Sequence, residues 1–176
     1  EILRRRPDLA PLLFENWYWD WRAQDPDAPA DYYVSPICSY VDGVFSTYAG
    51  SSMIFSAQRY PEVPRLTEAQ IELLRLYDEI SQEPGLPLDM DFQPGDVQWL
   101  LNYAALHSRT AYVDWPEPER RRHLLRLWLK RDVGRPLVPG FGKNVVTERG
   151  VGKKLKPGGS FRIAEAVVPK EDWGNE

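Results

Sequence analysis

Hydrophobic and polar residues alternate over several short stretches of this chain, which is the pattern of half-buried β-strands. The clearest case is residues 17–21, where tryptophans at every second position would share one face of a strand. Residues 32–40 and 44–48 flank Asp42-Gly43, a pair that tolerates the positive φ angles of a type I′ turn. We therefore predict a hairpin there. Alternation or apolar runs predict further strands over residues 88–92, 97–106 and 123–130.

The period becomes helical over residues 68–82, where one face would carry Ile71, Leu74, Tyr77 and Ile80. Thr67 and Gln70 have the spacing of a capping box, and Leu66 is placed to pack on Ile71 as a hydrophobic staple. A shorter helix is expected over residues 51–59. Several strands with one strong helix predict a mainly β fold, a sandwich or open barrel with helical decoration.

Composition narrows the function classes. The 176 residues are 43% hydrophobic and 27% charged, ordinary values for a globular domain, and the net charge of −4 argues against nucleic-acid binding. No apolar run approaches the length of a membrane span, so we expect no membrane association. One cysteine, Cys38, excludes an internal disulfide framework and favours a cytoplasmic location. One cysteine and two histidines also exclude a four-ligand structural zinc site.

Both histidines lie within residues 101–129, around an acidic loop that contains two prolines. His107 ends an apolar run, where a core would give way to the mouth of a cavity, and neutral imidazole is a good ligand for iron or zinc. A lone histidine at the end of a strand is also commonly structural or a surface residue, so both interpretations stand here. His123 would face the core and is expected to be packed and hydrogen-bonded rather than a ligand.

Arg122 and Arg126 would share one face of the strand predicted over residues 123–130 and its flank. A guanidinium can hold a carboxylate through two parallel hydrogen bonds, and a buried pair of arginines would need such an anion. A bound carboxylate is one partner, and Glu117 and Glu119 are the ordinary alternative. With His107, the two arginines indicate a metal-binding oxygenase that uses a dicarboxylate and whose other metal ligands lie outside this chain.

Other candidate sites are set aside on chemical grounds. Asp89, Asp91 and Asp96 lie beside Pro-Gly, where aspartate usually serves a turn rather than a metal. GFGKN and GVGKK lack the upstream glycine and the terminal Ser or Thr of a phosphate-binding loop. We expect a domain over residues 1–139 and a flexible, glycine- and lysine-rich tail over residues 140–176.

Three stretches resemble the C-terminal part of the TauD/TfdA-like (taurine dioxygenase) family of Fe(II)- and 2-oxoglutarate-dependent oxygenases: QPGDVQWLLNYAALHSRTAYVDWPEPERRRHLLRLWL, EILRRRPDLAPLLFEN and SAQRYPEVPRLTEAQ. The resemblance implies a double-stranded β-helix (jelly roll), with iron held by an early His-x-Asp/Glu pair and a late, distal histidine. His107 matches the distal histidine, and Arg122 matches the arginine that binds the remote carboxylate of 2-oxoglutarate. Arg126 matches a second arginine on the same strand, which in some members meets an anionic substrate, and it is expected with Arg122 as a cofactor-binding residue.

No His-x-Asp/Glu motif precedes His107, and the chain opens at Glu1 inside a helix-like pattern without a start signal. We therefore expect a partial jelly roll whose N-terminal portion, with the early iron ligands, is missing. The implied function is hydroxylation of a small, anionic organic substrate with O2, iron and 2-oxoglutarate, with this fragment alone inactive. The alternative is a non-catalytic, β-rich interaction module whose exposed tryptophans bind a partner. The oligomeric state stays open.

Overall fold

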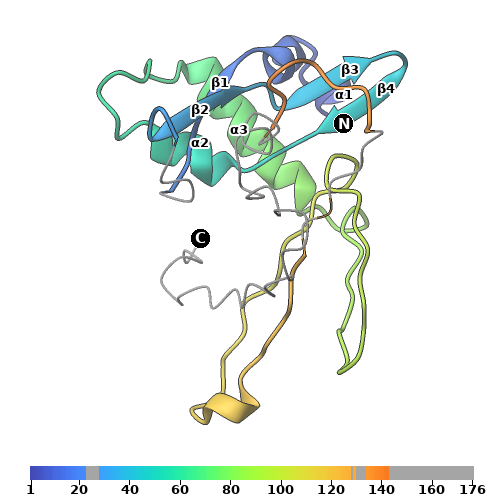
Figure 1. The fold of residues 1–176 in the computed structure, drawn as a ribbon. Helices are drawn as coiled ribbons and strands as arrows, with labels where there is room; N and C mark the ends of the chain where they lie inside the picture. The colour runs from blue at the N-terminus through green and yellow to red at the C-terminus, as the bar shows by residue number, and fades with distance from the viewer. Residues whose placement is uncertain (23–27, 128, 130–133, 143–176) are drawn as a thin grey trace. The chain divides into compact units, whose positions relative to one another are not determined.

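A computed structural model of the chain describes residues 1–22, 28–127, 129 and 134–142 (Figure 1). The chain divides into two compact units. The first contains Glu1–Leu106 and Pro136–Lys153, and the second contains His107–Arg135 and Lys154–Glu176. Most of the regular structure belongs to the first unit: α1 (Ile2–Arg5), η1 (Ala10–Phe14), β1 (Trp17–Asp20), β2 (Tyr32–Ser35), β3 (Cys38–Val41), β4 (Val44–Thr47), α2 (Ser51–Ala57) and α3 (Glu68–Ser81). The second unit contributes the 3-10 turn η2 (Pro118–Arg120).

The strands form two small antiparallel sheets, β1 with β2 and β3 with β4. Trp17 pairs with Ser35 at one end of the first sheet, and Cys38 pairs with Thr47 at one end of the second. Helix α2 contacts β1 and the 3-10 helix η1 contacts β3, in keeping with the predicted mainly β fold with helical decoration. The jelly roll stays a prediction.

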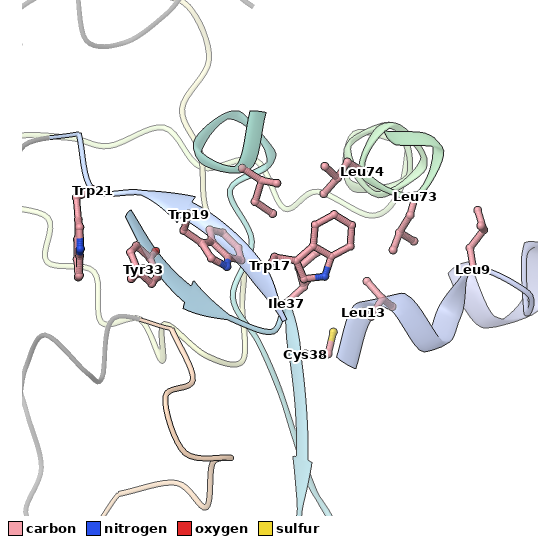
Figure 2. Close-up of a cluster of buried hydrophobic side chains, with 11 residues drawn as sticks. Leu9, Leu13, Trp17, Trp19, Trp21, Tyr33, Ile37, Cys38, Leu73 and Leu74 are labelled. Carbon is pink, nitrogen blue, oxygen red and sulfur yellow. The ribbon is translucent and has the colours of Figure 1, made fainter. Parts of the chain in front are cut away.

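The strand with an aromatic face is confirmed in β1. Trp17 and Trp19 are buried, whereas Tyr18 between them is half-buried. Figure 2 shows both indoles within a cluster that also contains leucines of α3 and of the η1 region. Each indole is also satisfied as a donor, because Trp19 Nε1 donates to the carbonyl of Ser35 at 2.8 Å and Trp17 Nε1 to that of Leu12 at 2.9 Å.

The predicted hairpin is confirmed at β3 and β4, with Asp42 at φ 51° and Gly43 at φ 76°. Positive φ at both central residues is what a type I′ turn requires. The single strand predicted over residues 32–40 was wrong, because two strands, β2 and β3, occupy that stretch. Pro36 lies between them, and since proline has no backbone N–H it interrupts a ladder of hydrogen bonds.

Helix α3 begins with the predicted capping box. The backbone N–H of Gln70 donates to Thr67 Oγ1 at 3.3 Å, and Gln70 Oε1 accepts from the N–H of Thr67 at 2.9 Å. Leu74 is buried as predicted, but Leu73, which the helical period did not select, is buried as well. The buried face of α3 is therefore wider than the one predicted from the helical period.

The predicted strands at residues 88–92 and 97–106 were wrong, because neither stretch is paired as a strand. Leu88, Val97 and Trp99 are 86%, 75% and 77% exposed, so the alternating side chains cover no core. A strand needs a neighbour for its backbone N–H and C=O groups, and alternation alone does not supply one. The tight turn is present, since Asp96 N–H donates to the carbonyl of Gln93 at 3.0 Å.

The segment from Val138 to Gly142 belongs to the first unit and packs against its residues before Leu106. Phe141 has no exposed surface, and its ring centre lies 5.3 Å from that of Tyr103. The N–H of Gly142 donates to Ser35 Oγ at 2.7 Å. Beyond residue 142 the glycine- and lysine-rich sequence lies outside the described residues, so the flexible tail stays a prediction. Among the helices that are described, none has the length and apolar content to cross a membrane.

Candidate functional site

Residues 107–127 of the second unit form two extended stretches on either side of η2, residues 107–117 and residues 121–127 (Figure 1). We call these stretches the two arms. Residues on the two arms interact at Arg122 and, through charge, at Arg126. Arg122 N–H donates to Asp114 Oδ1 at 3.0 Å, and the Arg122 guanidinium carbon lies 5.3 Å from the centre of the Tyr112 ring. Further from the turn, the charge of Arg126 acts on His107. The arms are thus antiparallel, although residues 123–127 and 129 form no strand, which overturns the prediction for 123–130.

The turn itself is held by the first two arginines of the Arg120–Arg122 run. The Arg120 guanidinium carbon lies 3.3 Å from the centre of the Trp115 ring, and its Nη1 is 3.8 Å from the carboxylate of Glu117. Arg121 donates to the carbonyls of Trp115 and Pro116 at 3.2 and 2.9 Å. These two side chains are therefore engaged in closing the turn. Arg122 instead contacts residues further from the turn, Tyr112 and Asp114.

His107 is exposed, yet its surroundings favour the neutral ring. Partial desolvation lowers the pKa of His107 below its ordinary value of 6.5, and the positive charge of Arg126 lowers it further. A neutral imidazole keeps the nitrogen lone pair that a metal requires. The arrangement suits the proposed role of His107 as a ligand, and that role stays a proposal.

Arg122 and Arg126 are both exposed, so the argument that buried guanidiniums would need an anion does not apply to them. No carboxylate of the described residues forms an ion pair with either side chain. Glu117, one of the two alternative partners, pairs with Arg120 instead. Both guanidiniums are therefore open to an anion from outside these residues.

The prediction that one face of residues 123–130 lies in the core was also wrong. Leu125 and Leu127 are 60% and 61% exposed, and His123 is exposed rather than packed. Trp128, placed on the arginine face by the alternation, lies outside the described residues. Without a hydrogen-bonded neighbour the segment has no buried side, because burial of a strand face comes from the layer that covers it.

A complete metal site is not formed by the described residues. They contain no group of three histidine, cysteine, aspartate or glutamate side chains that could hold an ion. Asp89 and Asp91 are exposed, and Asp96 Oδ2 accepts from the N–H of Gln93 at 2.8 Å, so Asp96 serves the turn as predicted.

Sequence reasoning missed two residues that contact Arg122, namely Tyr112 and Asp114. The signal available for them was their separation by two positions in an extended stretch, which places both side chains on one side of the arm. Arg109 was missed as well, and its guanidinium carbon lies 4.5 Å from the centre of the Tyr112 ring.

Comparison with known families gives the class of protein. Residues 9–128 match the family described as taurine catabolism dioxygenase TauD, TfdA. Because the match covers more than half of the chain, the chain belongs to that family of oxygenases. The family is generally dependent on Fe(II) and 2-oxoglutarate.

Two curated relatives are similar over most of this chain. FR-33289 synthase from Streptomyces rubellomurinus is 29% identical over 142 residues, which cover 76% of this chain and 40% of that protein. Taurine hydroxylase-like protein SAT17 from Stachybotrys chartarum is 30% identical over 148 residues, which cover 82% of this chain and 37% of that protein. The chain thus spans about two-fifths of the length of these relatives.

Proposed function

We propose that this chain is part of an Fe(II)- and 2-oxoglutarate-dependent oxygenase that hydroxylates a small, anionic organic substrate with O2. Membership of the TauD, TfdA family and similarity to a hydroxylase-like protein support the reaction class. In this proposal His107 is an iron ligand and Arg122 binds the remote carboxylate of 2-oxoglutarate. Arg126, whose charge acts on His107, is the second cation of the proposed pocket and faces the cosubstrate or an anionic substrate.

One observation carries the proposal. A segment of two facing arms presents an imidazole that favours its neutral form and two guanidiniums that pair with no carboxylate of the described residues. A planar guanidinium binds a carboxylate through two parallel hydrogen bonds, which orients a dicarboxylate as well as attracting it. Orientation of the cosubstrate is the contribution expected of Arg122.

The residues present do not fit a whole iron site. An oxygenase of this kind uses two histidines and one carboxylate as ligands, whereas the described residues bring no such group of three together, and His107 is the ligand proposed among them. We propose that the other ligands come from sequence outside this chain. In this proposal the described residues contribute ligation by His107, orientation by Arg122 and a second positive charge from Arg126, and we expect the chain alone to be inactive.

An anaerobic titration of this chain with Fe(II) and 2-oxoglutarate tests the ligand count. One imidazole should give no visible charge-transfer band, because chelated cosubstrate and iron would have too few protein ligands. Appearance of that band with the isolated chain would contradict the proposal that the remaining ligands lie elsewhere.

Arg122→Ala, in the protein that contains the complete oxygenase, tests the cosubstrate role. Loss of a charge-assisted, bidentate pair should weaken the apparent affinity for 2-oxoglutarate by about 10- to 100-fold. Arg120→Ala is the matched control, since it removes the same charge from a side chain engaged with Trp115 and Glu117. Equal affinities in the two variants would remove Arg122 from this role.

The interaction-module alternative loses its main support in the structure. It rested on the tryptophans of residues 17–21, but Trp17, Trp19 and Trp21 are 1%, 0% and 4% exposed; the tryptophans that are exposed among the described residues, Trp99 and Trp115, lie elsewhere. The rings of the three buried tryptophans pack in the core of the first unit, and this packing explains why tryptophans occur there.

A further inference from the structure

On the arm that precedes the turn, side chains at alternate positions contact the opposite arm. Tyr112 and Asp114 both reach Arg122 on the opposite arm, whereas Val113 between them is 94% exposed. In an extended backbone, successive side chains point to opposite sides, so residues 112 and 114 share one side. Two neighbouring side chains on that side therefore converge on a single arginine.

The Tyr112 ring acts on the guanidinium. The guanidinium carbon of Arg122 lies 5.3 Å from the ring centre, and that of Arg109 lies 4.5 Å from it. Both distances are within the range in which the negative face of an aromatic ring attracts a cation, which is up to about 6 Å. The two cations are consequently within about 10 Å of each other, roughly one Debye length at 0.1 M salt, so the ring also offsets repulsion between like charges.

Asp114 acts on the backbone of the same residue. Its Oδ1 accepts the backbone N–H of Arg122 at 3.0 Å, and its side chain is half-buried. A hydrogen bond to an ionised acceptor is stronger than a neutral one, so it restrains the position of the arginine backbone. Backbone and guanidinium of Arg122 are thus held by different residues of one arm.

We propose that Tyr112 and Asp114 are positioning residues for Arg122, which they hold ready for the remote carboxylate of a dicarboxylate cosubstrate. This inference rests on the function proposed above for Arg122. A long side chain that is already ordered loses less conformational entropy when it binds, and the affinity for the anion rises accordingly. Neither residue touches the reacting atoms in this proposal.

The first test measures whether the Arg122 side chain lies over the Tyr112 ring, and it needs no iron. NMR of the 176-residue chain should show the side-chain resonances of Arg122 shifted upfield by the ring current of Tyr112. Tyr112→Phe keeps the ring and should keep the shift, whereas Tyr112→Leu keeps apolar bulk without a ring and should lose it. Val113→Ala, at a fully exposed neighbour, is the control and should leave the shift unchanged.

The second test reads affinity in the complete oxygenase. Tyr112→Leu should raise the dissociation constant for 2-oxoglutarate about two- to fivefold, the loss expected for one exposed cation–π contact. Tyr112→Phe should restore the original constant. Asp114→Ala should raise it too, and Asp114→Asn, which keeps an acceptor oxygen, should raise it less. Turnover at saturating 2-oxoglutarate should be unchanged in all four.

The outcomes separate the two proposals. If Tyr112→Leu binds 2-oxoglutarate as the unaltered protein does while Arg122→Ala binds it weakly, the positioning role is overturned and the function of Arg122 stands. If Arg122→Ala has no effect on 2-oxoglutarate, both are overturned, whatever the ring-current shift. A loss of turnover at saturation in Tyr112→Phe would also overturn a positioning role, because the phenolic oxygen would then take part in the reaction.

Discussion

Arg59 lies with its Nη2 3.1 Å from Oδ2 of Asp20, which joins a guanidinium that is 57% exposed to a carboxylate with no exposed surface. The hydroxyls of Ser56 and Tyr60 and the backbone N–H of Arg22 donate to the same carboxylate. Asp20 therefore ties the end of β1 to α2 and to the residues that follow it.

Removal of this carboxylate should destabilise the first unit. Asp20→Ala leaves four donors without their acceptor, so we expect the free energy of unfolding to fall by roughly 2–4 kcal/mol. Urea denaturation followed by tryptophan fluorescence measures the change, since Trp17 and Trp19 are buried nearby in sequence. Glu62→Ala removes an exposed carboxylate as a control and should change the free energy by about 0.5 kcal/mol at most.

The same carboxylate should make stability depend on acid. Burial alone would raise the pKa of Asp20, but hydrogen bonds from Ser56, the Arg22 N–H and Tyr60, with the charge of Arg59, lower it below its ordinary 3.8. Because the folded pKa lies below the unfolded one, the contribution is complete above the unfolded pKa and is lost as pH falls through the folded value. Asp20→Asn should therefore lose less stability than the unaltered chain between pH 6 and about 2. Parallel curves for the two proteins would contradict this.

Gly43 should be required for its backbone conformation rather than for space. Its φ is +76°, and a Cβ placed there would meet no atom within 4 Å. Gly43→Ala should therefore cost about 1–2 kcal/mol of stability through strain alone. Gly43→Asn is the comparison, because asparagine accepts this conformation more readily, and its thermal midpoint should lie between those of glycine and alanine.

Thr67 should contribute to α3 through its side-chain oxygen. Thr67→Ala removes the acceptor for the Gln70 N–H and should lower the free energy of unfolding by about 1 kcal/mol. Thr67→Ser keeps a capping oxygen and should stay close to the original stability. A serine variant as unstable as the alanine variant would assign the effect to the methyl group of threonine instead.

The effect of the Arg126 charge on His107 can be measured by titration. Arg126→Gln removes one of the two causes that lower the pKa of His107, so that pKa should rise toward its ordinary value of 6.5. NMR of the imidazole ring protons against pH measures it in the metal-free chain. Arg120→Gln removes an equal charge that is engaged at the turn, and should leave the His107 titration unchanged.

The sequence predicted local structure correctly where the interacting residues lie close together in the chain. Thr67 and Gln70 cap each other across three residues, and Asp42-Gly43 closes its own hairpin. The tryptophans of β1 were predicted correctly because alternate positions of one strand share a face wherever the strand lies. None of these features depends on a distant part of the chain.

The signals failed where a partner had to come from elsewhere. Alternation at residues 88–92 and around Leu125 and Leu127 describes a strand only if another strand accepts its backbone groups, and these side chains are exposed. In the candidate site, the roles predicted for Arg122 and Arg126 from their spacing stay predictions, and the contacts of Arg122 come from the opposite arm. Tyr112 and Asp114 could be found only once the turn had brought the arms together.

The seating of Phe141 and Gly142 has a practical consequence for anyone who trims this protein. The family match stops at residue 128, yet Ser35 and Ser39, within β2 and β3, use their hydroxyls to accept the backbone N–H groups of Gly142 and Val138. Truncation after residue 128 would remove the fully buried Phe141 from its contact with Tyr103. It would also expose the buried hydroxyls of Ser35 and Ser39 to water. Expression clones should therefore retain at least Gly142.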